Sequence, residues 1–341
     1  MESSIIFIVL ILVFCMAVWL AYNFLSKSNY DDQGKKSDRP SYIVWDKINK
    51  HKNNNSLWDI EIRDLEIANL KAELDKHIMG NKDLKIAMIL CFFTKQHLLI
   101  ESVPWLAKTT AVKLFSKLVD FDQKRVQWTP DLLPSDIVGN QVIVWGKVEF
   151  NKWPIFTNIL LFDEINRTTP KTQSALIQAM EEKQVTLYGQ DMKLPDPFVV
   201  FATLNPIEQR WTYSLPEAQL DRFGMKVTLN YPSREEEKQI ISISNVNTDD
   251  INPVIDQSIY HSIIHKINDI SCSDNVLDYV ANILEYSRIG KDVKIGWSPR
   301  SGKDMIKFGK CVAYIRWSDD VSIDDIDTIR ENVLSHRIIK K

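Results

Sequence analysis

The sequence predicts an α/β fold in which a five-stranded parallel sheet is covered by helices on both faces. Five short, almost continuously apolar runs recur along the middle of the chain, and stretches with helical spacing separate them. Strands that are buried on both faces lack polar alternation, and helices between such strands are typical of a parallel sheet. The runs are "HLLIE" (97–101), "RVQW" (125–128), "NILLF" (158–162), "PFVVFATL" (197–204) and "MKVTL" (225–229).

Length and composition indicate a globular protein with room for two domains. The chain has 341 residues, of which 45% are hydrophobic and 26% charged, and a domain usually takes ~100–200 residues. The net charge of −3 lacks the basic excess of a nucleic-acid-binding protein, so we expect no nucleic-acid partner. None of the four cysteines forms a C-x-x-C pair, and the "HSIIH" of His261 and His265 lacks the glutamate of a zinc protease. We therefore expect free thiols and structural histidines.

The N-terminal segment, residues 1–26, is predicted to be a membrane anchor. Its run "IIFIVLILVFCMAVWLAY" carries no charge over about 18 residues, which is close to the minimum for a bilayer span. No small-residue cleavage site follows, and basic residues downstream favour a cytoplasmic side. We expect residues 5–25 to cross the inner (cytoplasmic) membrane once, with the body facing the cytoplasm; a buried core helix is the alternative. A polar tether, 27–59, follows.

The stretch "ESVPWLAKTT" (101–110) lies where a phosphate-binding loop would lie, after the first strand and before a helix that begins near Thr109. A P-loop reads G-x-x-x-x-G-K-[ST], and here Ser102 and Ala107 stand at the two glycine positions, with Trp105 between them. Loop amides would hold phosphate oxygens, Lys108 would add a positive charge, and Thr109 would bind Mg²⁺. An ordinary strand-to-helix turn is the alternative. The predicted nucleotide-binding residues are Ser102, Val103, Pro104, Trp105, Leu106, Ala107, Lys108, Thr109 and Thr110.

Polar side chains also follow the third and fourth apolar runs. Asp163 and Glu164 end "NILLFDE", an arrangement in which the aspartate helps to bind Mg²⁺ and the glutamate polarises the attacking water. Adjacent carboxylates at a buried strand end repel each other, so we expect a cation or another compensating partner beside them. Asn205 follows the fourth run and could reach the same water.

Longer motifs resemble a known family. "LLFDEINRTTPKTQSALIQAMEEKQVTLYG", "LPDPFVVFATLNPIEQ" and "TYSLPEAQLDRF", with "GWSPRSGKDMIKFGKCVAYIRW" near the C-terminus, are similar to the MoxR family of AAA+ ATPases. The resemblance covers about three quarters of the chain. It implies an AAA+ P-loop core over residues 60–232 and a small all-α lid domain over residues 233–341.

The resemblance also implies roles for individual residues. Lys108 and Thr109 match the Walker A motif, and Asp163 with Glu164 matches Walker B. Two β-hairpin insertions are expected at "QVIVWGKVEF" and "KQVTLYGQDMKLP". The remaining matched positions are Asn205 as sensor 1, Arg222 as the arginine finger offered to a neighbouring subunit, and Arg300 as the sensor 2 arginine.

The sequence departs from the family pattern at positions where the family has glycine or proline. The family loop reads G-V-P-G-L-A-K-T, so Ser102 and Trp105 replace glycines, and Trp211 and Ser214 replace a glycine and a proline. Each lost glycine could cost ~1–3 kcal/mol if it served a strained or closely approached backbone.

Two functional hypotheses follow. In the first, the chain is a membrane-anchored ATPase that uses ATP and Mg²⁺ to remodel or mature a partner complex. It would form a homo-oligomeric ring, expected to be a hexamer, beside a partner with a von Willebrand factor A domain. In the second, it is a pseudo-ATPase that binds partners with little or no turnover.

Overall fold

The computed structural model covers the chain from residue 56 onward with short gaps. The predicted anchor and most of the predicted tether lie outside the described residues, as do residues 103–107 of the predicted phosphate loop. Among the described helices, none is both long and apolar enough to cross a membrane. The described residues are 56–102, 108–129, 131–144, 147–151, 154–187, 189–206, 212–242, 251–289 and 293–340.

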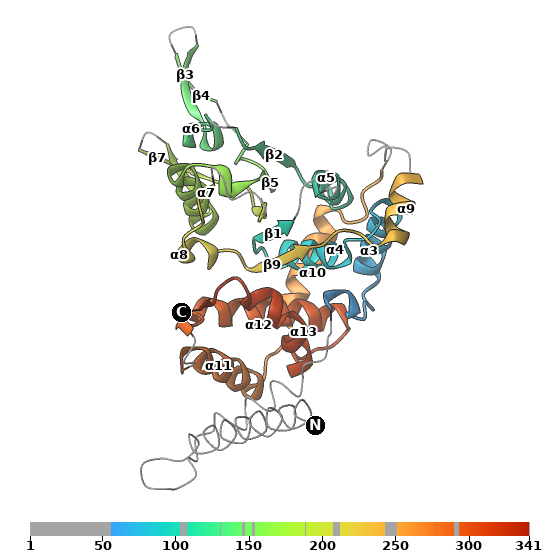
Figure 1. Cartoon of the computed structure of the whole chain (residues 1–341). Coiled ribbons are helices and arrows are strands. Elements are labelled where there is room, and N and C mark those ends of the chain that lie inside the picture. Colours follow the sequence, from blue (N-terminus) through green and yellow to red (C-terminus); the bar gives the residue numbers. More distant parts are fainter. Residues whose placement is uncertain are drawn as a thin grey trace, which may run out of the picture. The chain divides into compact units, whose positions relative to one another are not determined.

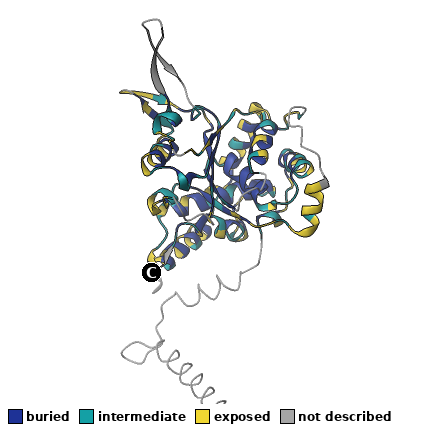
Figure 2. Cartoon of the chain, turned by 45° about the horizontal axis from the view of Figure 1, so that its top comes forward, coloured by how far each residue is buried: buried dark blue, intermediate teal, exposed yellow. Residues whose placement is uncertain are grey.

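A parallel sheet of five strands forms the centre of the unit that spans residues 54–341. Its strand order is β2 (Gln123–Gln127), β5 (Ile159–Asp163), β8 (Val199–Leu204), β1 (Leu98–Ser102) and β9 (Met225–Leu229), and every neighbouring pair is parallel. Each strand coincides with one of the five apolar runs, so the predicted sheet is confirmed. Figure 2 shows the middle of the sheet, β5, β8 and β1, among the most deeply buried parts of the fold.

Because all five strands are parallel, the sheet has one amino edge and one carboxyl edge. The first residue of β1, Leu98, pairs with Met225 at the start of β9. At the other end, Gln127 of β2 pairs with Asp163, the last residue of β5. Loops at the carboxyl edge are the usual ligand-binding position in such folds.

Helices cover both faces of the sheet (Figure 1). One face carries α3 (Leu65–His77), α4 (Lys82–Phe93), α5 (Lys108–Leu118) and α10 (Gln257–Asp269), and the other carries α7 (Pro170–Glu182). The chain turns between α3 and α4 at Gly80, whose φ of +67° is a conformation that glycine adopts without strain.

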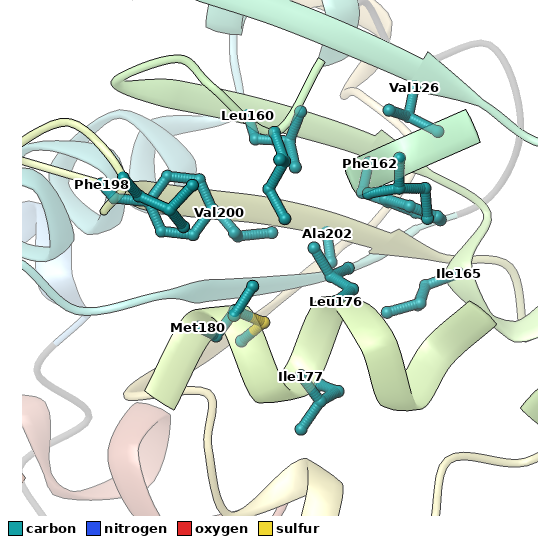
Figure 3. Packing of buried hydrophobic residues seen from close by; sticks show 14 of the residues in the cluster. Val126, Leu160, Phe162, Ile165, Leu176, Ile177, Met180, Phe198, Val200 and Ala202 are labelled. Atoms are coloured by element: carbon teal, nitrogen blue, oxygen red, sulfur yellow. The ribbon is translucent and has the colours of Figure 1, made fainter. Parts of the chain in front are cut away.

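The core between α7 and the sheet shows why these segments fold as they do. α7 directs Leu176 and Met180 at the sheet, one helical turn apart, and meets Leu160 of β5 with Val200 and Ala202 of β8 (Figure 3). All five side chains are almost fully buried, and burying a large apolar side chain contributes ~1.5–3 kcal/mol. This packing fixes the end of α7 against the amino edge of the sheet.

Both expected hairpin insertions are present. The first pairs β3 (Asn140–Val144) with β4 (Lys147–Asn151), and the second pairs β6 (Gln184–Leu187) with β7 (Gln190–Lys193). The second turns at Gly189, which has a φ of +80°.

The C-terminal part is mainly helical, as predicted, and it also contains two short strands. A short antiparallel pair, β10 (Val293–Ile295) with β11 (Ile339–Lys340), joins the segment after α11 to the chain end. α12 packs on α13 through Gly309, where a Cβ would lie 2.7 Å from Ile326 Cδ1. The remaining elements are η1 (Leu57–Asp59), α6 (Pro134–Val138), η2 (Ile165–Arg167), α8 (Glu217–Leu220), α9 (Arg234–Ser242), α11 (Asp274–Ile289), α12 (Pro299–Ile315) and α13 (Ile323–Leu334).

Candidate functional site

The carboxyl edge of the sheet holds a partly buried lysine. Lys108 is the first residue of α5, and its Nζ donates a hydrogen bond of 2.6 Å to Oγ of Ser102 at the end of β1. Burial lowers the pKa of Lys108 below its ordinary value, while the carboxylates of Asp163 and Glu164 oppose that shift. The lysine is therefore close to both acidic residues that the sequence singled out.

Thr109 and Thr110 follow Lys108 in the first turn of α5. Thr109 is half-buried and Thr110 is exposed. A helix N-terminus with free amide groups favours anions. Val103, Pro104, Trp105, Leu106 and Ala107 lie outside the described residues, so the predicted loop is described only at its two ends.

The acidic pair is held by two arginines. Asp163 is buried, and its Oδ2 accepts a hydrogen bond of 2.6 Å from Nε of Arg125 on β2. Oε2 of Glu164 lies 3.1 Å from Nε of Arg167. The expectation that the two carboxylates need compensating partners is confirmed, and the partners are these arginines.

Glu164 has a backbone conformation that is uncommon for its residue type. Its φ of +56° and ψ of 53° are left-handed, and its N–H donates a hydrogen bond of 2.8 Å to Oγ1 of Thr203 on the adjacent strand β8. Left-handed non-glycine residues cost of order 1 kcal/mol or more and gather at functional sites. The conformation turns Glu164 away from the line of β5, so that its carboxylate and that of Asp163 take different partners.

Asn205 comes directly after β8 and is buried. The backbone carbonyl oxygen of Asn205 accepts a hydrogen bond of 3.2 Å from Nδ2 of Asn166, which lies just beyond the acidic pair. The structure therefore brings Lys108, Asp163, Glu164 and Asn205 to one edge of the sheet.

This edge fits a magnesium nucleotide in its chemistry. Phosphate oxygens would find an ammonium group and a helix N-terminus, and Mg²⁺ would find the oxygen ligands that it prefers at Thr109 and Asp163. The described residues contain no group of three or more His, Cys, Asp or Glu side chains that could hold a metal by themselves. Mg²⁺ usually keeps several waters and binds through one or two carboxylates plus substrate phosphates.

The two predicted arginines lie elsewhere, at the amino edge. Arg222 lies three residues before the start of β9, and Arg300 is the second residue of α12. Both are ion-paired with the same carboxylate: Arg222 with Oε2 of Glu181, and Arg300 with Oε1 at 2.5 Å. A five-residue strand spans about 13–16 Å, so the length of the sheet separates this cluster from Lys108.

Four residues at these two edges were missed by the sequence analysis: Arg125, Arg167, Glu181 and Thr203. Arg125 carried a usable signal, since a charged residue within a predicted strand needs a partner there. The sequence contains no pattern that points to Glu181, because nothing in the α7 segment indicates that two arginines from distant segments meet at its end.

Comparisons with known proteins agree with this geometry. Residues 97–225 match the family described as "ATPase family associated with various cellular activities (AAA)". The uncharacterized protein YeaC of Bacillus subtilis is 38% identical over 270 residues, covering 78% of this chain and 84% of that protein. Chaperone MoxR1 of Mycobacterium tuberculosis is 37% identical over 282 residues, covering 78% and 74%.

A crystal structure of a protein from Cytophaga hutchinsonii superposes with a TM-score of 0.76 at 35% identity, covering 81% of this chain and 88% of the other. Fold, family match and relatives all agree with the motifs at the carboxyl edge. The chain belongs to the MoxR family of AAA+ ATPases.

Proposed function

We propose that the chain is a membrane-anchored ATPase that works in a ring and remodels or matures a partner protein complex. AAA+ family membership implies nucleotide binding, typically with Mg²⁺, and MoxR-type proteins generally form oligomeric rings. Beyond these family properties, we propose that this chain hydrolyses ATP, that its ring is a hexamer and that it has a membrane anchor.

The residues at the carboxyl edge would divide the work among them. Lys108 binds phosphate oxygens, and Thr109 with Asp163 holds Mg²⁺, which neutralises charge on the phosphates when bound. Glu164 orients and deprotonates the attacking water, and Asn205 fixes that water from the neighbouring strand.

One observation carries the proposal: the groups needed for phosphoryl transfer lie on opposite edges of one sheet. Arg222 and Arg300 are a strand length away from Lys108. Side chains of this length cannot bridge that distance within one subunit. They would serve a nucleotide held by the next subunit, which is the arrangement that a ring provides.

The hydrogen bond between Lys108 and Ser102 favours the pseudo-ATPase as a second candidate. Ser102 stands where the family has glycine, and its hydroxyl engages the ammonium group that should meet phosphate. A hydrogen bond to a charged group contributes ~1.5–3 kcal/mol, so a nucleotide that displaces Ser102 would bind roughly 10- to 150-fold more weakly.

The membrane and partner assignments also belong to the proposal. Residues 5–25 would cross the inner membrane with the body in the cytoplasm, and a protein with a von Willebrand factor A domain would act beside the ring. The uncharged run and its basic downstream flank support the anchor.

Hydrolysis by mixed rings tests the proposal. Glu164→Gln should retain ATP binding and lose turnover, because only the water-activating carboxylate is removed. Arg222→Ala should lose turnover as well. Mixing the two variants should restore part of the activity, since some interfaces then combine an intact Glu164 with an intact Arg222.

Glu182→Gln is the matched control, because Glu182 is exposed at the end of α7 and bonds only to Gln178 Nε2 among the described contacts. Its turnover should equal that of the unmodified chain. Unchanged turnover in Glu164→Gln would show that the site is wrongly assigned, and no ATP binding by the natural chain at millimolar ATP would favour the pseudo-ATPase.

A further inference from the structure

A basic pocket lies at the amino edge of the sheet, beside the two arginines. Its volume is about 270 Å³, and it opens between the N-terminal half of α12, the end of α7 and the residues before β1. This is below the ~300–1,000 Å³ of typical pockets for drug-sized ligands, so it suits a small anion better than a whole nucleotide. Its lining residues are Lys95, Gln96, His97, Met180, Glu181, Lys183, Arg222, Arg300, Lys303, Asp304 and Lys307.

Positive charge dominates this pocket. Six lining residues are cations and two are carboxylates. Asp304 is engaged by Arg337 from outside the lining, and Glu181 is shared by two arginines. Among the described contacts, Lys183 and Lys303 have no carboxylate partner, whereas Lys95 pairs with Asp196 outside the lining and the charge of Lys307 acts on Asp304. A concave surface with such an excess attracts anions and concentrates them.

Lys183 distinguishes the pocket from an ordinary solvated lysine surface. It ends α7 in a left-handed conformation, and its Nζ donates a hydrogen bond of 3.2 Å to the carbonyl of Phe198. The same Nζ lies 3.0 Å from Nε2 of His97, which is buried. Lys183 is itself half-buried, so its ammonium group is partly removed from water without an ion-paired carboxylate as its partner.

His97 cannot serve as that partner for a charged lysine. Its Nδ1 accepts a hydrogen bond of 3.0 Å from the N–H of Val200, so the proton of the neutral ring is on Nε2 and points to the carbonyl of Met180 at 3.2 Å. The Lys183 ammonium thus faces another donor. Burial and the charge of Lys307 lower the pKa of Lys183 to about 8, Lys95 adds to that shift, and Asp196 opposes it.

α12 supplies the remaining charges from one face. Arg300, Lys303 and Lys307 are three and seven residues apart, which places them on the same side of the helix. Lys310 lies further along the same side, beyond the pocket lining, and donates to the carbonyl of Asn268. Lys303 and Lys307 are exposed to solvent, so they line the open side of the pocket.

We propose that this pocket binds a phosphate-bearing anion, with Lys183, Lys303 and Lys307 as the groups that hold the phosphoryl oxygens. Two sources offer the same chemistry: a free polyphosphate, or the terminal phosphate of a nucleotide bound by the neighbouring subunit. The second source rests on the proposed function, because it needs a ring and an occupied Lys108 site.

Calorimetric titration with inorganic tripolyphosphate tests the free anion on the full chain in mild detergent. The Lys108→Ala variant is used so that the carboxyl-edge site cannot contribute. Adding Lys183→Met, or the pair Lys303→Gln and Lys307→Gln, should weaken binding by roughly tenfold, the loss of one hydrogen bond to a charged group. Adding Lys310→Gln should leave binding unchanged.

Proton uptake provides a second readout in the same titration. At pH 8, about half of the Lys183 side chains are neutral, so binding should take up about 0.5 proton per anion, falling to about 0.1 at pH 7. Comparing two buffers of different ionisation enthalpy measures this number, and Lys183→Met should abolish it.

ATP-dependent ring assembly tests whether the pocket binds the terminal phosphate of a nucleotide held by the neighbouring subunit. Assembly of the non-hydrolysing Glu164→Gln chain, followed by sedimentation, should require roughly tenfold more ATP when Lys183→Met is added and no more with Lys310→Gln. If anion binding or ring assembly depends on Lys183, Lys303 and Lys307, the result supports the proposed pocket. The experiment that shows the dependence identifies which of the two phosphate sources the pocket binds.

The proposal would be overturned if neither anion binding nor ring assembly depended on these lysines, or if Lys310→Gln weakened them equally. If the Lys108 site binds no ATP, only the assembly arm is affected. The tripolyphosphate titration then still decides whether the pocket binds phosphate.

Discussion

Acid should destabilise the fold through His336, which follows α13 in the C-terminal segment. Its Nε2 lies 2.8 Å from the carbonyl of Phe223, a hydrogen bond that needs the ring proton on Nε2. Nδ1 is buried without a hydrogen-bond partner in the described part of the chain. A second proton would therefore be buried on Nδ1 without an acceptor, beside the charged Arg337.

Burial, with a further contribution from the charge of Arg337, lowers the pKa of His336 from 6.5 to about 3. Because the folded pKa is lower than the unfolded one, the unfolded chain binds the additional proton between these two values. The free energy of unfolding therefore falls as the pH falls from 6.5 toward 3. At pH 4.5, two units below the unfolded pKa, the expected loss from this one group is about 3 kcal/mol.

Urea unfolding at pH 7 and pH 4.5, followed by tryptophan fluorescence, measures this loss. His336→Gln keeps an N–H that can donate to the Phe223 carbonyl but removes the titrating group, so its stability should depend less on pH by about 3 kcal/mol. His97, whose pKa burial also lowers well below its ordinary value, contributes equally to both proteins and cancels in the comparison. His261→Gln, at an exposed position, is the control. Parallel pH dependences in the natural chain and His336→Gln would refute the argument.

Restoring the family glycines with Ser102→Gly and Trp105→Gly should tighten ATP–Mg²⁺ binding by at least ~10-fold, as ~1.4 kcal/mol of relieved strain predicts; equal affinities in calorimetry would show that the glycines do not matter. Glu181→Gln should lower kcat roughly tenfold with little change in KM, since it frees both arginines that the carboxylate holds. Glu182→Gln should leave kcat and KM unchanged. A lowered KM with an unchanged kcat in Glu181→Gln would count against a positioning role for Glu181. Deleting residues 1–26 should move the protein from the membrane to the soluble fraction, and in intact spheroplasts added protease should leave the body uncut.

The sequence predicted the sheet well because its three central strands, β5, β8 and β1, are almost completely buried. Runs such as "NILLF" and "PFVVFATL" have no polar alternation, and few other structures bury every residue of such a segment. The carboxyl-edge site followed from the same reasoning, since residues directly after parallel strands meet at one edge. Asp163 and Asn205 are near each other for that reason alone.

Features that depend on distant or very short segments could not be predicted in this way. Glu181 joins Arg222 and Arg300, which are separated by 41 and 119 residues from it, and no local pattern records such a contact. The strands β10 and β11 have three and two residues, too few to produce a period in hydrophobicity. Sequence reasoning therefore missed the strand pair and the amino-edge cluster, although it had named both arginines.

In the single chain, the charged groups at both edges of the sheet already have partners within the same chain. Lys108 donates to Ser102, Asp163 accepts from Arg125, and both amino-edge arginines share Glu181. A nucleotide must replace the first of these contacts, Mg²⁺ competes with the second, and a neighbour's phosphate competes with the third. Each replaced hydrogen bond to a charged group costs ~1.5–3 kcal/mol, so one ligand acting on one subunit recovers only part of this free energy. A ring in which nucleotide, metal and neighbour arrive at the same interface makes all three new contacts together, which is why we expect ATP binding and subunit assembly to strengthen each other in this protein.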